Sequence, residues 1–285
     1  MDGWPPLSDE SLLARLALAD DEFFEVMRAF AQAVPRGEFS EAVFERALGY
    51  PWERPGHSFL LDGTTVLAID ELPPLGGEPR YPLLAIGSNG SPDTLIRKLA
   101  DLPPDEQRLA VITGELHDFD IGAAGLPTFY GSFAGTIFGS PGTVVSAALL
   151  LVTAVQMTVL AVTERSYSFG RLDAIRFEPD LAGMDTVSSA FAFVSRWGAH
   201  CIDGAPVALA AIPASARSAP AYTQEQLLDR VASLALGEAA TGRDLVRRIT
   251  EEFGATGASL APALRELTQP FASDRWTPWP GATGR

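Results

Sequence analysis

Short apolar runs separated by turn signals fill the middle of the chain, from Ser58 to Ile212. Each run has the length and the β-branched or apolar content of a strand. The runs are residues 59–61, 65–69, 81–86, 109–116, 135–138, 144–152, 167–175, 190–194, 199–202 and 207–212. Asp62-Gly63 and Asp203-Gly204 are dipeptides typical of tight hairpins. So many short strands with few helices between them predict a closed or strongly curved mixed sheet.

Helical spacing replaces this pattern on both sides, over residues 8–48 and 223–268. Ser8 is the expected N-cap of one helix that runs to Pro35, and a second helix is expected to begin at Ser40. We therefore predict an α+β chain with three parts. They are an N-terminal helical extension over 1–57, a small mixed β-barrel-like core over 58–215, and a C-terminal helical extension and tail over 216–285.

Two stretches between or beyond these elements have no regular pattern. Residues 50–57 are too rich in proline to be regular and aromatic enough to be packed down as a crossing loop. We favour a plain linker there, with a lid over a pocket as the alternative. The tail from Pro270, with two tryptophans among prolines and glycines, is expected to lie along the surface or to be partly disordered.

The charge balance argues against a nucleic-acid partner. The 285 residues include 21 basic and 36 acidic side chains, for a net charge of −15, and Lys98 is the only lysine. The N-terminus lacks the basic start and apolar run of a signal peptide, and no apolar stretch is long enough to span a membrane. These observations predict a cytoplasmic protein that binds no membrane. Cys201 is the only cysteine, so no internal disulfide can form, and we expect a buried, inert thiol.

A strand, a glycine-flanked turn and a helix follow one another over residues 81–99. Ser91 is a suitable N-cap, Pro92 fits the first helical position, and Asp93 lies where the helix dipole favours a carboxylate. The backbone N–H groups of residues 87–91 would then point at a small anion such as a carboxylate. Ordinary turn chemistry is the alternative explanation of the same residues.

Glu164 is the one carboxylate in an unusual setting. Thr153 and Gln156 form a capping box for a short apolar helix, which ends at Glu164 just before a strand. Partial burial there would make Glu164 a usable general base, whereas a surface pair with Arg165 or another arginine is the alternative.

The other chemistry-bearing residues give weaker signals. His57, His117 and His200 are scattered singly, so spacing predicts no metal site, and the common hydrolase, nucleotide and metalloprotease motifs are absent. His117 with Asp118 and Asp120 is either catalytic or, as we favour, a solvated strand end.

Three blocks in order resemble the gamma-glutamylcyclotransferase-like family of the AIG2/BtrG-like group. The blocks are Ala85-Ile86-Gly87-Ser88-Asn89, then residues 133–145 with their Ser-Pro-Gly turn, then Leu160-Ala161-Val162-Thr163-Glu164 followed by Tyr167. Residues 116–119 also fall where the family often has a strand end. The resemblance covers about residues 81–177, and the flanking helices lie outside it.

The resemblance implies a small barrel-like cyclotransferase core and a metal-independent reaction without a cofactor. The implied enzyme releases an amine from a small-molecule gamma-glutamyl amine or peptide by closing the glutamyl part into 5-oxoproline. Glu164 would be the catalytic acid and base, and the implied substrate-binding residues are Ile86, Gly87, Ser88, Asn89, Gly90 and Tyr167. The resemblance is also compatible with a homodimer.

One departure from the family pattern concerns Ile86, which stands where the family has a tyrosine in the loop. Tyr130 or Tyr167 is a candidate to supply the missing hydroxyl. Two other functions therefore stay open. One is a non-catalytic binding or scaffold protein on the same fold, and the other is an amide hydrolase that uses water activated by Glu164.

Overall fold

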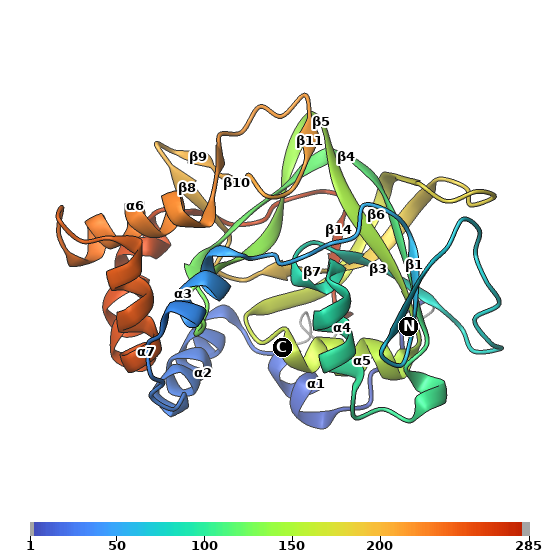
Figure 1. The fold of residues 1–285 in the computed structure, drawn as a ribbon, viewed down its shortest axis with the longest axis horizontal. Coiled ribbons are helices and arrows are strands. Elements are labelled where there is room, and N and C mark those ends of the chain that lie inside the picture. Colours follow the sequence, from blue (N-terminus) through green and yellow to red (C-terminus); the bar gives the residue numbers. More distant parts are fainter. Residues whose placement is uncertain (1–2, 281–285) are drawn as a thin grey trace.

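The computed structural model describes residues 3–280 and contains a closed five-stranded barrel (Figure 1). Its strands are β3 (Tyr81–Ala85), β4 (Leu109–Pro127), β5 (Phe133–Val152), β6 (Tyr167–Pro179) and β7 (Val187–Ser195). They follow one another around the barrel as β5, β3, β7, β6 and β4, and β4 pairs again with β5. Only the β3–β7 pair is parallel. The predicted α+β class with a closed mixed sheet is thus confirmed.

The remaining strands extend the sheet or pair at its edges. They are β1 (Phe59–Asp62), β2 (Thr65–Ala68), β8 (Ala199–Ile202), β9 (Ala205–Pro206), β10 (Ala208–Leu209), β11 (Ala214–Ser215), β12 (Ala221–Tyr222), β13 (Thr268–Gln269) and β14 (Trp276–Pro278). The predicted hairpins at Asp62-Gly63 and Asp203-Gly204 are confirmed, and Asp203 and Gly204 adopt the positive φ values of 52° and 82° that such tight turns need. The expected strand 207–212 is wrong beyond β10, because Ile212 N–H donates to Leu209 in a turn.

One long hairpin, β4–β5, replaces three expected separate strands. Pairing runs on both sides of Asp118, since His117 pairs with Val144 and Phe119 with Gly139. Residues 140–143 of β5 therefore bulge out opposite Asp118, whose Oδ1 accepts from Gly142 N–H at 3.0 Å. The expected strand end at residues 116–119 is wrong, because this bulge absorbs the Ser-Pro-Gly turn without ending the pairing.

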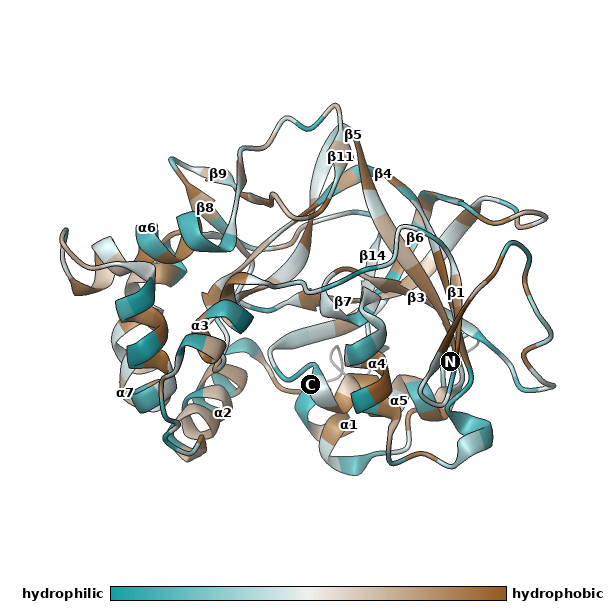
Figure 2. Ribbon diagram, in the orientation of Figure 1, coloured by the Kyte–Doolittle hydropathy of each residue, from teal (hydrophilic) through white to brown (hydrophobic). Residues whose placement is uncertain are grey.

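Alternating side chains divide the apolar residues between two cores. In β3, Leu84 belongs to a core that reaches the C-terminal helices, whereas Leu83 and Ala85 belong to a second core beneath the other helices. This is the period of two expected of a strand covered on both faces. Figure 2 shows the same arrangement, with hydrophobic barrel strands and helices that are hydrophobic on part of their surface.

Seven α-helices of the described residues form two groups around the barrel (Figure 1). The first group is α1 (Glu10–Leu16), α4 (Pro92–Leu99) and α5 (Ala154–Thr163). The second group is α2 (Asp20–Ala33), α3 (Glu41–Leu48), α6 (Gln224–Leu236) and α7 (Gly242–Glu266). The N- and C-terminal helices thus pack on each other, while the division of the chain into three parts stays a prediction.

The single helix expected from Ser8 to residue 34 is wrong, because α1 and α2 are separate. Asp9, not Ser8, caps α1, and its Oδ1 accepts from Leu12 N–H at 2.6 Å. Ala19 has extended backbone angles that end any continuous helix. Ser40 caps α3 as expected.

Residues 276–279 of the tail are held by strand pairing and by a buried indole. Trp276–Pro278 form β14, which pairs with Gly170–Leu172 of β6. Trp279 is 8% exposed and packs against Trp4 at 5.2 Å between ring centroids. Of the two alternatives expected for the tail, disorder is wrong for residues 276–279, because strand pairing and indole burial fix them. Residues 281–285 of the predicted tail lie outside the described residues.

His200 is fully buried in β8, and within residues 3–280 neither of its ring nitrogens has a hydrogen-bond partner. Burial lowers its pKa from 6.5 to about 4. Between these two pH values the unfolded chain therefore binds more protons at His200 than the folded chain does. The contribution of neutral His200 to the free energy of unfolding is fully present above about pH 6.5, and about 3 kcal/mol of it is lost as the pH drops to about 4.

Urea unfolding of the wild type and of His200→Leu between pH 7.5 and pH 4 measures this effect. We expect the leucine variant to lose most of the decline in stability over this range. His57→Leu, at an exposed histidine, is the control and should keep the wild-type slope. An unchanged slope in His200→Leu would show that other groups cause the acid sensitivity.

Two further expectations concern the thiol and the membrane. Cys201 is free and buried, and burial raises its pKa, as expected of an inert thiol. Among residues 3–280, no helix combines the length and the apolar character needed to cross a membrane.

Candidate functional site

The glycine-flanked loop forms as the sequence predicts, with a short 3-10 turn, Ser88–Gly90, between β3 and α4. Ser91 occupies the N-cap of α4 and Pro92 its first position, although the Ser91 side chain makes no capping hydrogen bond. Inside the turn, Gly90 N–H donates to Gly87 at 3.1 Å and Ser91 N–H donates to Ser88 at 3.0 Å. Two of the amides expected to bind an anion therefore already donate within the loop itself.

Glu164 directly follows α5, as predicted. The capping box of Thr153 and Gln156 starts the helix. At its other end, Arg15 of α1 donates from Nη2 to the carbonyl of Ala161 at 2.7 Å. A cation at a helix C-terminus is electrostatically favourable and fixes this end. The carboxylate of Glu164 thus projects from a rigid helix end.

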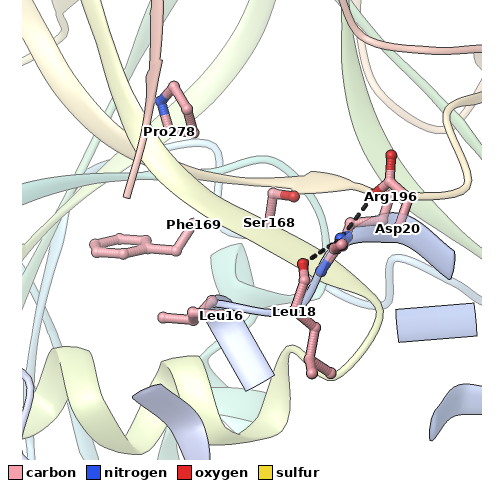
Figure 3. Close-up of a pocket in the computed structure, with 8 residues that line it drawn as sticks. Leu16, Leu18, Asp20, Ser168, Phe169, Arg196 and Pro278 are labelled. Atoms are coloured by element: carbon pink, nitrogen blue, oxygen red, sulfur yellow. Dashed lines mark hydrogen bonds and ion pairs between the residues drawn. The ribbon is translucent and has the colours of Figure 1, made fainter. Parts of the chain in front are cut away.

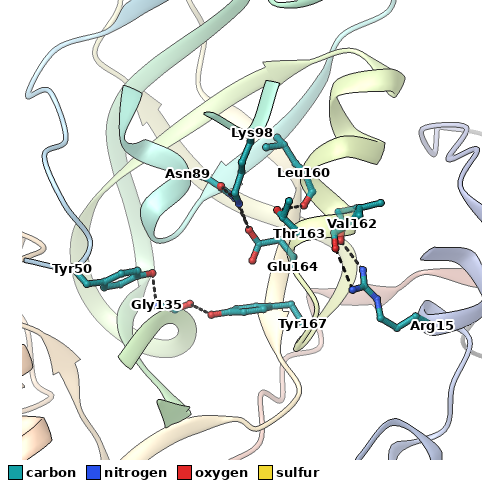
Figure 4. A network of polar contacts seen from close by, with 11 residues as sticks. Arg15, Tyr50, Asn89, Lys98, Gly135, Leu160, Val162, Thr163, Glu164 and Tyr167 are labelled. Carbon is teal, nitrogen blue, oxygen red and sulfur yellow. Dashed lines mark hydrogen bonds and ion pairs between the residues drawn. The ribbon is translucent and has the colours of Figure 1, made fainter. Parts of the chain in front are cut away.

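Asn89, Lys98 and Glu164 meet in one hydrogen-bonded group (Figure 4). Glu164 Oε1 accepts from Asn89 Nδ2 at 3.1 Å and from Lys98 Nζ at 2.8 Å. Lys98 Nζ also donates to Asn89 Oδ1 at 2.8 Å. The Lys98 and Glu164 side chains are only 12% and 16% exposed. The alternative, a surface pair of Glu164 with an arginine, is therefore wrong, because its partner is a lysine in a partly buried site.

The second carboxylate oxygen of Glu164 is differently placed. Within residues 3–280, no hydrogen-bond donor reaches Oε2, although Oε1 accepts two hydrogen bonds. In Figure 4 the Glu164 carboxylate lies between the Asn89–Lys98 pair and a row formed by Tyr50, Gly135 and Tyr167. One oxygen thus holds the group in place, and the other makes no hydrogen bond within the described residues.

Two tyrosines bracket Gly135 on the far side of Glu164. Tyr167 donates its hydroxyl to the Gly135 carbonyl at 2.9 Å, and the Tyr50 oxygen accepts from Gly135 N–H at 2.7 Å. Burial, with a smaller effect of the Glu164 charge, raises the pKa of Tyr50 to about 12, and burial also raises the pKa of Tyr167. Both phenols are therefore neutral at pH 7 and remain hydrogen-bond donors.

Tyr50 also lies against the glycine loop, because a Cβ atom on Gly87 would collide with its hydroxyl oxygen. Trp52 packs next to Tyr50 with 5.4 Å between ring centroids, and Tyr130 follows at 5.7 Å from Trp52. Trp52 Nε1 donates to the Arg46 carbonyl at 3.1 Å, which ties the segment to α3. The start of this segment therefore packs against the glycine loop and α3, as expected of a crossing loop and not of a plain linker.

The structure brings together most of the residues expected at the site, but not all. Gly87, Asn89, Tyr167 and Glu164 share the contacts described above. Ile86 is 6% exposed and its side chain belongs to the core that reaches the C-terminal helices. Whether Ile86, Ser88 and Gly90 contact a substrate stays a prediction.

Sequence reasoning missed three residues of the site: Tyr50, Arg54 and Lys98. Arg54 lies against Gly90, where a Cβ atom would come within 2.6 Å of its Nε. Lys98 carried a signal, because the only lysine among 21 basic residues stands in the last turn of the short helix that starts after the loop. Tyr50 and Arg54 carried none, since both belong to a segment that looks like a linker.

His117 and Asp120, which the sequence analysis grouped together, have different partners in the structure. His117 Nε2 lies 3.1 Å from Glu178 Oε2, with Glu115 close by, but Glu178 is also paired with Arg176, so we assign no metal to these residues. Asp120 is fully buried and forms two hydrogen bonds with Arg217, at 2.8 and 2.9 Å. The solvated strand end expected for Asp120 is therefore wrong.

Two clefts lie apart from Glu164. One, of about 270 Å³, is lined by residues that include Leu16, Phe169 and Arg196, and Arg196 donates across it to Leu18 and Asp20 (Figure 3). That volume is at or below the lower end of typical ligand pockets. The other, of about 580 Å³, lies beside the β4–β5 bulge at Asp118.

Comparison of the sequence with known proteins adds no identification, because no protein-family model matches it and no curated protein matches it significantly.

Proposed function

We propose that the protein is a gamma-glutamylcyclotransferase-like enzyme, which releases an amine from a gamma-glutamyl amine or peptide and forms 5-oxoproline. The observation that carries the proposal is the position of Glu164. One of its oxygens is held by Asn89 and Lys98, and the other is without a donor among the described residues. A fixed carboxylate beside a glycine loop is suited to move a proton on a substrate bound there.

The proposed reaction consists of proton transfers, one bond that forms and one bond that breaks. Glu164 Oε2 takes a proton from the substrate's α-ammonium, and the freed nitrogen attacks the substrate's own γ-carbonyl carbon. The bond from that carbon to the leaving nitrogen then breaks as Glu164 returns the proton to the departing amine, and the ring nitrogen loses its second proton to the released amine, which leaves as an ammonium ion. Because the attack is intramolecular, holding the substrate in the bent shape supplies a large share of the rate increase.

Tyr50 supports the proposal by bringing a phenol to the loop where position 86 lacks one. Its oxygen accepts from Gly135 N–H, and its own proton has no acceptor among residues 3–280. A neutral phenol in this position can donate to the oxygen of the γ-carbonyl as negative charge develops there. Tyr130 lies farther along the same aromatic row, beyond Trp52.

A non-catalytic binding protein on this fold is the alternative, and one observation favours it. The Tyr50 hydroxyl fills the space directly beside Gly87, next to the region where the proposed substrate binds. Hydrolysis by a water activated at Glu164 is the other alternative, and it differs from cyclisation in its product.

The test is product analysis with a panel of gamma-glutamyl amines, using NMR to detect 5-oxoproline and free glutamate. We expect amine and 5-oxoproline in equal amounts, without glutamate. An N-acetylated substrate is the control, because its blocked nitrogen cannot cyclise but its amide can still be hydrolysed. Release of glutamate would favour hydrolysis, and no release from any panel member would favour the non-catalytic protein.

A further inference from the structure

We infer that Arg54 binds the α-carboxylate of the substrate and so restricts the site to gamma-glutamyl compounds whose α-carboxylate is free. This inference rests on the function proposed above, which gives the ligand its carboxylate.

Arg54 lies against the glycine loop at Gly90. A Cβ atom on Gly90 would come within 2.6 Å of Nε, 3.2 Å of Cζ and 3.3 Å of Nη2 of Arg54. Three atoms of the guanidinium plane thus approach one backbone position, and only glycine leaves room for them. Gly90 follows Asn89, whose side chain donates to Glu164, so Arg54 and the proposed base contact neighbouring residues of one short turn.

Arg54 has no anionic partner in the described part of the chain. It is partly buried, and burial lowers its pKa, although an arginine remains charged at any ordinary pH. Arg196 and Arg217, which are also poorly exposed, each pair with an aspartate. A partly desolvated cation without a counter-charge is unfavourable until an anion binds.

Three of the five loop amides expected to bind an anion, those of Ser88, Gly90 and Ser91, already act on other groups. Gly90 and Ser91 N–H donate within the turn, and the N–H groups of Ser88 and Gly135 both act on the Tyr50 oxygen, lowering its pKa against the larger effect of burial. Arg54, and not these amides, therefore binds the α-carboxylate of the substrate. A guanidinium matches a carboxylate with two parallel hydrogen bonds, which a lysine cannot reproduce.

The experiment compares the affinities of wild type, Arg54→Gln, Arg54→Lys and Arg36→Gln for 5-oxoproline and for 2-pyrrolidinone, which has the same ring without the carboxylate. Titrations are followed by NMR, and thermal melts check folding. We expect Arg54→Gln to bind 5-oxoproline about 10- to 100-fold more weakly, with unchanged affinity for 2-pyrrolidinone. Arg36 is exposed on the same N-terminal segment, and Arg36→Gln should match the wild type.

Arg54→Lys keeps the charge but not the paired donors, and we expect it to bind 5-oxoproline more weakly than the wild type even if the glutamine variant fails to fold. Equal affinity of the Arg54 variants and Arg36→Gln for 5-oxoproline would overturn the inference, as would a wild type that does not bind it. If the wild type binds 5-oxoproline through Arg54 but turns over no gamma-glutamyl amine, the carboxylate site stands and the proposed reaction fails.

Discussion

Glu164→Gln is expected to lower the turnover of a gamma-glutamyl amine by about 10²- to 10⁴-fold, the usual contribution of a positioned proton-transfer group. Glutamine keeps an oxygen that can accept from Asn89 and Lys98, so the local shape is maintained. It removes the second oxygen as a base. We therefore expect kcat to fall and the affinity for 5-oxoproline to change much less.

The measurement is the rate of 5-oxoproline release by the wild type and the variant, with thermal melts as the folding control. Glu178→Gln is the matched control, because Glu178 is also hydrogen-bonded but pairs with Arg176 and His117, away from the glycine loop. Equal rates for Glu164→Gln and the wild type would remove Glu164 from the mechanism. A similar loss in Glu178→Gln would point to a general effect on folding.

Asp120→Ala is expected to lower the free energy of unfolding by about 3–5 kcal/mol, the largest stability effect that we predict. Asp120 is fully buried in β4, and Arg217, with a side chain 13% exposed, donates to both of its carboxylate oxygens. Arg217 also donates to the Ile212 carbonyl at 2.9 Å, so the pair ties the segment after β10 to the barrel. Removing the carboxylate leaves the guanidinium without its counter-charge in a place of low solvent access.

Urea unfolding of Asp120→Ala measures this loss, and Glu41→Ala is the control. Glu41 pairs with Arg243 at the surface, with side chains 58% and 41% exposed, so its removal should change stability little. Replacing both partners, as Asp120→Leu with Arg217→Met, should recover part of the loss, because no unpaired charge is left behind. A loss in Asp120→Ala no larger than in Glu41→Ala would show that the buried pair contributes little.

Local patterns predicted the parts of the fold that depend on neighbours in sequence. The capping box at Thr153, the helix start at Ser91 and Pro92, and the Asp203-Gly204 hairpin all formed as expected. Errors arose where distant pairing decided the outcome. Asp118 lies opposite a four-residue bulge that only the partner strand reveals, and Trp276 is ordered because β6 offers an edge.

In the candidate site, too, local patterns were predicted and contacts between distant segments were not. The Glu164 carboxylate and the glycine loop were each visible as local patterns, and the structure joins them through Asn89. Tyr50 and Arg54 were missed because their significance depends on where a proline-rich segment crosses the barrel, which no periodicity encodes. Asp120 was misread because burial of a strand residue depends on Arg217, which lies between the last expected strand, 207–212, and the helical residues from 223 onward, where no pattern points to a partner.

The place of Lys98 makes the chain unusually open to selective labelling. It is the only lysine of the sequence, and its ammonium lies 2.8 Å from the proposed catalytic carboxylate. Reductive methylation with ¹³C-formaldehyde would therefore add a label to one side chain, besides the α-amino group of the chain. The ¹³C signal of that side chain would report directly on the ion pair with Glu164, and its shift during titration with a ligand would show when the site is occupied.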